Sequence, residues 1–387
     1  MNTNTKFPRT LILHNVVSPY RLPVFAALHQ QTPVEVWFTR RKTADRQWDT
    51  SLDAATYPVK ILKSWLIGPI FVNPTLLWNL IRQPFDIYLV GDFPETALAT
   101  FTTIFWAKLR RKPIIMWSET TDNEVLFFQT LVTSNNKFQK FIHQLLSHIA
   151  AGYRRVLLSL PDHFVALSAA AKLFLEEQGI KPAYMSTGTQ VMPESLLPAP
   201  TVSRRRATHS RPVTFLYLGY LNPAKGIDQL ITAFKQLPPA RCRLIIVGSG
   251  PADAYLRELA AGQPNITFAG YVSDGTEKAN YYTKADCLVL PTLGDCWGLV
   301  INEALHYGTA VITTTAAAGS QVLKPFPECI IPPRDPHSLH QTLQYFLDHP
   351  EKLKVIGQWG AAQKSLTSTN QGAKPLIEAI YEVRGHS

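Results

Sequence analysis

The segment Val289–Val311, VLPTLGDCWGLVINEALHYGTAV, constrains the fold more than any other part of the chain. An apolar run ends at Pro291, a glycine-containing loop follows, and a helical pattern then leads into a second apolar run. Two carboxylates, Asp295 and Glu303, stand eight residues apart within it. Backbone N–H groups at a helix start favour phosphate, and carboxylates accept hydrogen bonds from neighbouring hydroxyls. The segment therefore predicts a strand–loop–helix unit that binds a phosphate and a sugar together, as a nucleotide-sugar site does.

Both halves of the chain alternate β-rich and helical runs, which predicts α/β domains with parallel, doubly wound sheets. At 387 residues the chain is long enough for two such domains. We expect ten strands at LILHNVV, PVEVWFT, DIYLVG, KPIIMWS, HFVALS, VTFLYLG, LIIVGSG, ITFAGYV, CLVLPT and AVITTT. Helices are expected at Leu22–Gln30, Thr96–Arg111, Lys137–Leu160, Asp228–Leu237, Ala252–Ala261, Glu277–Ala285, Leu299–Tyr307 and Pro336–Leu347.

A segment rich in Pro, Ser and Arg interrupts the alternation and predicts a linker. We expect an N-terminal Rossmann-like acceptor domain over 1–195, the linker over 196–211 and a C-terminal donor domain over 212–365. Residues 366–387 would form a helical segment that returns to the first domain. Ligands of such sheets bind beyond the carboxyl ends of the strands, so the two domains are expected to face each other across a cleft.

The net charge of +10 is unevenly distributed along the chain. Residues 1–195 contain 20 Lys and Arg against 14 Asp and Glu, and the linker adds four arginines and no acid. Residues 212–387 contain 14 of each sign. The excess predicts an anionic partner of the first half, such as anionic lipid or a phosphorylated acceptor, although a basic soluble surface also fits. No nucleic-acid module is present, so nucleic acid is not expected as a partner.

The chain shows no signal peptide and no run of 18 apolar residues, so we expect a cytoplasmic protein. Two stretches, Trp65–Ile81 and Phe101–Lys112, place Trp and Phe beside cations, as segments at a membrane surface do. Peripheral contact with the inner membrane face is therefore one reading. The helical spacing of the same residues favours a core position instead.

Three loops of the second half follow strands and should meet at one sheet edge. They are GYLNPAKG (Gly219–Gly226), the turn GSGP and the loop that contains Asp295. Lys225 can place a positive charge on a phosphate. The G-x-G of GSGP is a weak signal, and a tight turn is its expected role.

Taken in order, GYLNPAKG, GSGP, FAG (Phe268–Gly270) and PTLGDCWGLVINEA resemble the C-terminal domain of family-4 retaining glycosyltransferases, which have the GT-B fold. The resemblance covers Thr214 to Pro336. It implies a retaining glycosyltransferase that uses a nucleotide-sugar donor and needs no cofactor and no metal site.

The resemblance also implies roles for individual residues. Lys225 would neutralise the donor diphosphate, Asp295 would contact the transferred sugar, and Glu303 would hold the ribose. The backbone groups expected to contact the donor are those of Gly219, Gly298, Leu299, Val300, Tyr271 and Val272.

Two positions depart from the family pattern. Tyr220 stands where an arginine is usual, and Asp295 stands where a glutamate is usual. These departures favour a non-catalytic nucleotide-sugar-binding relative as an alternative. Arg21, in the first loop of the other domain, is our candidate for the missing cation, although an ion-paired structural arginine is an equal reading.

In the first half, carboxylates follow the expected third and fourth strands: Asp92, Glu95, Glu119 and Asp122. Glu119 directly follows a buried strand and is our candidate for a catalytic acceptor group, with solvated loop carboxylates as the alternative. A lipid-linked or polysaccharide acceptor is favoured by the basic first half, and a soluble secondary metabolite is the second choice.

Overall fold

The computed structural model describes residues 7–42, 50–53, 55–67, 70–121, 152, 154–203 and 211–385. These residues form two compact units. The first contains the residues up to Thr120, the stretch that ends at Thr189, and Thr369–Ser387; the second contains mainly Gln190–Ser368. The predicted helix Lys137–Leu160, the linker residues Arg204, Arg205 and Arg206, and Asp122 fall wholly or mostly outside the described residues.

The first unit is built on a seven-stranded parallel sheet with the strand order β3-β2-β1-β6-β7-β8-β9. Its strands are β1 (Thr10–Val16), β2 (Val34–Arg40), β3 (Val59–Ile61), β6 (Ile87–Gly91), β7 (Ile114–Ser118), β8 (His163–Ala166) and β9 (Met185–Thr187). Strands β1, β6, β7 and β8 are buried along most of their length, because helices cover both faces of the sheet.

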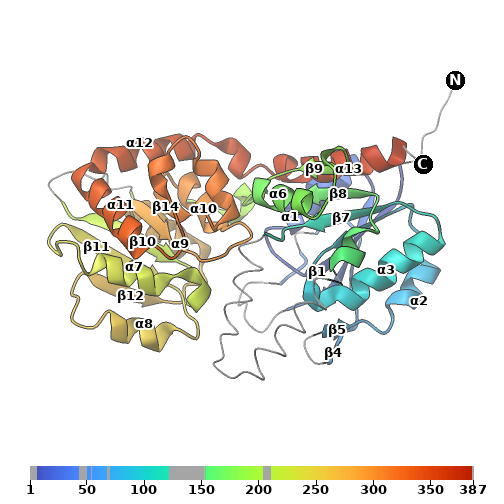
Figure 1. Cartoon of the computed structure of the whole chain (residues 1–387), viewed down its shortest axis with the longest axis horizontal. Coiled ribbons are helices and arrows are strands. Elements are labelled where there is room, and N and C mark those ends of the chain that lie inside the picture. Colours follow the sequence, from blue (N-terminus) through green and yellow to red (C-terminus); the bar gives the residue numbers. More distant parts are fainter. Residues whose placement is uncertain are drawn as a thin grey trace. The chain divides into compact units, whose positions relative to one another are not determined.

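The helices of this unit are α1 (Leu22–Gln31), α2 (Leu76–Arg82), α3 (Ala97–Leu109), α6 (Ala169–Glu177) and α13 (Thr369–Gly385). The last helix packs against α1 and against β8 and β9, although most of the second unit lies between them in sequence (Figure 1). A short antiparallel hairpin, β4 (Trp65–Ile67) and β5 (Ile70–Val72), lies beside α3.

The second unit is built on a six-stranded parallel sheet with the order β12-β11-β10-β13-β14-β15. The strands are β10 (Val213–Leu218), β11 (Cys242–Val247), β12 (Ile266–Gly270), β13 (Cys287–Leu290), β14 (Ala310–Thr314) and β15 (Ile330–Ile331). The helices are α7 (Ile227–Phe234), α8 (Asp253–Leu259), α9 (Gly275–Lys284), α10 (Val300–His306), α11 (Pro336–Asp348) and α12 (Pro350–Ala361).

Short 3₁₀ helices complete both units: η1 (Pro94–Thr96), η2 (Pro182–Tyr184), η3 (Glu194–Leu196), η4 (Pro223–Lys225), η5 (Ala318–Leu323), η6 (Pro327–Cys329) and η7 (Lys364–Leu366). The expected α/β class with two doubly wound parallel sheets is confirmed. Each of the ten predicted strands is present, within one or two residues at most ends. The strand order reverses at β1 and β6 in one sheet and at β10 and β13 in the other, so ligand-binding loops are expected beyond the carboxyl ends of these strands.

The interpretation of Trp65–Ile81 and Phe101–Lys112 as core is wrong for a large part of both stretches. Trp65 begins a hairpin strand and is 54% exposed, and Phe105 on α3 is 69% exposed. Helical spacing could not distinguish the two faces of α3, because apolar residues occupy both of them. Among the described residues, no helix is both long and apolar enough to cross a membrane.

Candidate functional site

The candidate site of the second unit lies where the sheet order reverses. Lys225 ends the short helix η4 in the loop after β10, and Asp295 lies in the loop after β13. The Lys225 Nζ donates to Asp295 Oδ2 at 2.5 Å, and both side chains are mostly buried but reach solvent. The two residues that were predicted to meet the diphosphate and the sugar are therefore directly in contact.

The backbone around Lys225 is held by the loop after β13. Leu293 N–H donates to Ala224 O at 2.7 Å, and the Thr292 hydroxyl donates to the same carbonyl at 3.1 Å. Gly226 has φ +64°, and a Cβ at this position would lie 2.2 Å from Pro291 O. Glycine is required there because both the left-handed backbone and the close approach exclude a side chain. The glycine that follows Lys225 therefore allows the Lys225 loop to pack closely against the loop that contains Asp295.

The GSGP turn packs against the loop that contains Gly219. Leu221 N–H donates to Ser249 O at 3.0 Å, and Gly248 N–H donates to Gly270 O at 2.8 Å. A Cβ at Gly248 would lie 1.9 Å from Gly219 O. This G-x-G is thus a tight turn, as expected, and it contacts both the Gly219 loop and the end of β12.

Asp295 continues into the turn that begins α10. Its Oδ1 accepts from Trp297 N–H at 3.3 Å, and its own N–H donates to Ala316 O at 3.1 Å. Gly298 follows with φ +86° and is buried, whereas Leu299 and Val300 are partly exposed. The first N–H groups of a helix have no hydrogen-bond partner inside the helix. Those of Leu299 and Val300 can therefore bind a ligand, and their contact with the donor stays a prediction.

Glu303 lies on α10 and accepts a hydrogen bond from the Tyr282 hydroxyl at 2.6 Å. Burial raises the pKa of the Glu303 carboxyl above its ordinary value, although the Tyr282 hydrogen bond acts in the opposite direction. Tyr282 stacks on Tyr307 with ring centroids 5.6 Å apart. The carboxylate is therefore oriented by a tyrosine from α9 that the sequence did not single out.

Beyond β12, Tyr271 is 46% exposed and Val272 is buried. Contact of their backbone groups with the base of the donor stays a prediction. Tyr220, in place of the usual arginine, is 40% exposed, and its carbonyl accepts from the Tyr217 hydroxyl at 3.0 Å. Tyr220 therefore brings a ring to this edge, where the family pattern has a charge.

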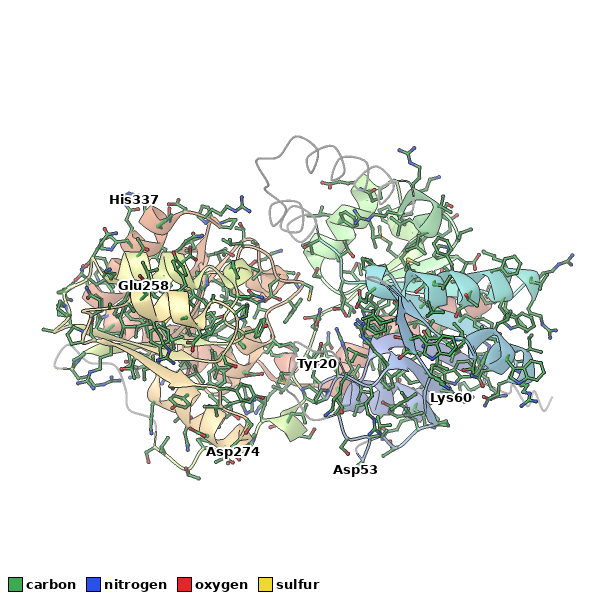
Figure 2. All side chains as sticks on the ribbon, turned by 90° about the horizontal axis from the view of Figure 1, so that it is seen from below. Tyr20, Asp53, Lys60, Glu258, Asp274 and His337 are labelled. Carbon is green, nitrogen blue, oxygen red and sulfur yellow. The ribbon has the colours of Figure 1, made fainter. Side chains whose placement is uncertain are left out.

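In the first unit, the structure brings Arg21 and Glu119 together, although they were predicted for different roles. Arg21 follows β1, is 4% exposed, and forms an ion pair with Glu119, which follows β7. The guanidinium lies 4.7 Å from the Trp117 ring centroid and 5.1 Å from that of Tyr20, which Figure 2 labels. Glu119 also accepts from Trp117 Nε1 at 2.8 Å.

Asp92, after β6, lies at the same carboxyl edge of this sheet. Its Oδ2 accepts from the Ser118 hydroxyl at 2.6 Å and from the Thr120 hydroxyl at 2.9 Å. Burial is the main cause that raises the pKa of Asp92, and the charge of Glu119 adds to it. A cation, two carboxylates and an aromatic ring therefore gather where an acceptor is expected to bind.

Within the part of the chain that the structure describes, no three His, Cys, Asp or Glu side chains gather in an arrangement that could hold a metal ion.

Comparison with known proteins finds similarity to glycosyltransferases. The family of glycosyl transferases group 1 matches residues 212–349. An uncharacterized glycosyltransferase of Methanocaldococcus jannaschii is 32% identical over 150 residues, 38% of this chain and 36% of that protein. A phosphatidyl-myo-inositol mannosyltransferase of Mycolicibacterium smegmatis is 36% identical over 115 residues, 28% of this chain and 29% of that protein. These matches thus span about a third of each relative's length.

The solved structures extend the similarity to the whole chain. The sucrose-phosphate synthase of Thermosynechococcus elongatus superposes with a TM-score of 0.71 at 18% identity, over 98% of this chain and 100% of that one. The chain therefore has the two-domain, Rossmann-like GT-B fold, and its second unit carries a group 1 glycosyltransferase domain.

Proposed function

We propose that this GT-B glycosyltransferase moves a sugar from a nucleotide-sugar donor to an acceptor, with retention of anomeric configuration and without a metal ion. The observation that carries the proposal is the contact between Lys225 and Asp295 at the reversal point of the second sheet. The turns at Gly226 and Gly298 position this pair, and Glu303 lies on α10, the helix that follows the Asp295 loop.

Donor binding exchanges the partners of this pair. The diphosphate takes the Lys225 ammonium, and sugar hydroxyls replace that ammonium as hydrogen-bond donors to Asp295. Glu303 accepts from the ribose hydroxyls, while backbone groups of Gly219, Gly298, Leu299 and Val300 face the phosphates and the sugar. Tyr271 and Val272 hold the base through their backbone.

In the transfer step, the bond from the anomeric carbon to the diphosphate oxygen breaks. A bond from the acceptor oxygen forms on the same face of the sugar, and the acceptor proton moves to the leaving phosphate. Lys225 and the backbone N–H groups offset the charge that develops on the diphosphate. Such preorganised hydrogen-bond donors stabilise the transition state by several kcal/mol, and removal of one of them typically costs roughly 3–4 kcal/mol.

For the acceptor, we propose a lipid-linked or polysaccharide molecule at the inner membrane face. The basic first half of the chain supports an anionic or lipid-linked acceptor. The name of the mycobacterial relative, a phosphatidyl-myo-inositol mannosyltransferase, favours the same class. Asp92 and Glu119 offer hydrogen bonds to acceptor hydroxyls. A soluble metabolite is the alternative acceptor.

A second candidate function is non-catalytic binding of a nucleotide sugar. It is favoured by Tyr220 in place of an arginine cation and by the shorter Asp295 in place of a glutamate. Such a protein would bind donors and release no nucleoside diphosphate.

The test begins with thermal unfolding in the presence of UDP-, GDP- and ADP-sugars. A ligand at 100 times its Kd stabilises the folded state by about 2.7 kcal/mol, so the true donor raises the melting temperature. Release of nucleoside diphosphate is then measured with EDTA and with Mn²⁺, and the anomer of the product is assigned by NMR. Glu303→Ala should lose the donor-induced shift, whereas Glu258→Ala, an exposed residue of the same unit (Figure 2), should keep it.

Binding without release of nucleoside diphosphate, with acceptors of every class tested, would establish the non-catalytic function. Activity that needs Mn²⁺ and disappears with EDTA, or a product of inverted configuration, would refute the mechanism.

A further inference from the structure

The first unit exposes large apolar side chains on three neighbouring elements. Hairpin β4–β5 and helix α2 both lie beside α3, as Figure 1 shows. On the hairpin, Trp65 is 54% and Leu66 is 63% exposed. On α2, Leu77, Trp78 and Ile81 are 45%, 54% and 48% exposed.

Helix α3 is apolar on both of its faces. Ala99, Ile104 and Ala107 belong to the core of the unit. On the opposite face, Leu98, Phe105 and Leu109 are 47%, 69% and 64% exposed, and their spacings of seven and four residues place them in one stripe. A stripe of large apolar side chains on the outer face of a helix that already contributes to a core marks a surface for a second apolar partner. We call the exposed side chains of α3, α2 and the hairpin the outer apolar surface.

Cations adjoin this surface. Arg82 ends α2, with its guanidinium 4.4 Å from the Trp78 ring centroid. Arg110 and Arg111 follow the end of α3, and Arg110 lies 5.7 Å from the Trp106 ring. Among the residues with described positions, none offers Arg82 or Arg110 a carboxylate within ion-pair distance. Lys108 and Lys112, by contrast, pair with Asp162 and Asp86.

Aromatic and aliphatic side chains beside arginines match the chemistry of an anionic lipid surface. Trp and Phe enter the boundary between headgroups and acyl chains, while arginines contact lipid phosphates. A protein partner would need a complementary acidic rim, and in a second copy of this chain the same arginines would repel one another.

We propose that the outer apolar surface docks the first unit onto an anionic bilayer. The docking deepens the proposed function and rests on it for the lipid-linked acceptor, because it brings the acceptor domain to the membrane that would hold such a lipid.

The full chain is tested by co-sedimentation with vesicles of phosphatidylcholine and phosphatidylglycerol in equal parts, and with phosphatidylcholine alone. We expect binding to the anionic vesicles at low salt, and weakening of that binding at physiological salt. The double variant Phe105→Ser/Leu109→Ser should lower the partition coefficient about 10-fold or more. The matched control is Leu173→Ser/Val156→Ser, which removes two side chains of 58% and 53% exposure from elsewhere in the same unit and should bind unchanged.

The charge contribution is tested by Arg82→Gln/Arg110→Gln. Each arginine near an anionic surface contributes about 1 kcal/mol, so loss of both should lower the partition coefficient about 10- to 30-fold. Arg243→Gln/Lys354→Gln changes the net charge equally on exposed residues of the second unit and should have little effect.

Three results would overturn the proposal. The wild-type chain could fail to bind anionic vesicles at low salt. The Phe105/Leu109 variant could bind as tightly as the Leu173/Val156 control. The wild-type chain could form a dimer that the Phe105/Leu109 variant abolishes, which would assign the surface to a second copy. Donor-induced thermal stabilisation, measured on the same samples, separates these failures from failure of the proposed function, since Lys225 and Glu303, which are proposed to bind the donor, belong to the second unit.

Discussion

The ammonium of Lys225 and the carboxylate of Asp295 form an ion pair at 2.5 Å, although seventy residues separate them in the sequence. They meet because β10 and β13 are neighbours in the sheet and both loops leave the same edge. One ammonium cannot give its best contact to a carboxylate and to a diphosphate at once. The pair therefore competes with the donor that it is proposed to bind, and the sugar hydroxyls must compensate Asp295 for the lost partner.

This competition predicts opposite effects of Asp295→Asn on two measurements. Neutralising the carboxylate removes its ion pair with Lys225, so affinity for a nucleoside diphosphate should rise, while sugar transfer should fall by about 10-fold or more. Isothermal titration with the nucleoside diphosphate and initial rates of transfer measure the two quantities on the same preparation.

Lys225→Met is the matched comparison for that variant. It should weaken nucleoside diphosphate binding by about 10- to 150-fold, because a charged hydrogen bond of about 1.5–3 kcal/mol is lost. If Asp295→Asn and Lys225→Met weakened nucleoside diphosphate binding equally, the ion pair would be a structural unit and the proposed exchange would be wrong.

Donor binding should also depend on pH through Glu303. Ribose hydroxyls donate to an ionised carboxylate, so affinity should be full above the pKa of Glu303 and fall as pH decreases through it. Because that pKa is raised by burial, the loss should begin at a higher pH than for an exposed glutamate. The same shift means that ionising Glu303 costs folding stability as pH rises through its pKa.

Tyr282→Phe tests this account, because it removes the hydroxyl that stabilises the ionised form. The midpoint of the binding profile should move to higher pH, while affinity at alkaline pH stays near that of the wild type. Tyr281→Phe, on the same helix, is the control and should leave the midpoint in place. An unchanged midpoint in Tyr282→Phe would mean that the profile reports another group.

The backbone at Gly226 gives a prediction about stability. Gly226→Ala places a Cβ 2.2 Å from Pro291 O on a residue with φ +64°, so the loops of Lys225 and Asp295 must separate. Gly262→Ala is the matched control, since φ is +77° there but no atom lies within 4 Å of the added Cβ. The control should cost about 1–2 kcal/mol of unfolding free energy for the left-handed backbone alone. Gly226→Ala should cost more and also weaken donor binding; equal costs in urea unfolding would contradict the close packing of the two loops.

Much of the fold follows from sequence pattern. Strands such as Ile87–Gly91 and Cys287–Leu290 are continuous apolar runs between turn residues, which is typical of buried parallel strands. Strands β3, β4 and β5 have only three residues each, too few to show a period, and none was predicted. The outward face of α3 could not be predicted either, because the buried Ile104 and the exposed Phe105 have the same apolar character.

The parts of the candidate site that lie within one loop could be predicted from the sequence. Contacts between side chains of different loops could not. The glycines around Lys225 mark a strained turn, and Asp295 precedes a helix, so each loop could be recognised alone. That Tyr282 orients Glu303, or that Arg21 meets Glu119, depends on which strands become neighbours and on side-chain conformation. No spacing in the sequence carries that information.

The ion pair of Arg21 and Glu119 gives the last prediction, which separates a structural role from a functional one. Both side chains are largely buried, with 4% and 12% exposure, so removing one charge takes away the ion-pair partner of the other. Arg21→Met and Glu119→Gln should each cost about 3–5 kcal/mol of unfolding free energy, and the double variant should cost less than their sum. Lys112→Met and Asp86→Asn form the control cycle, because that pair is 36% and 51% exposed and should show a coupling near zero.

Transfer rates are then measured well below the melting temperature of each variant. If Glu119 binds the acceptor, Glu119→Gln should raise the acceptor KM while donor binding stays normal. A normal KM with a large coupling energy would assign the pair to stability alone and leave Asp92 as the carboxylate at this edge. A coupling energy near zero would show that the pair does not stabilise the first unit.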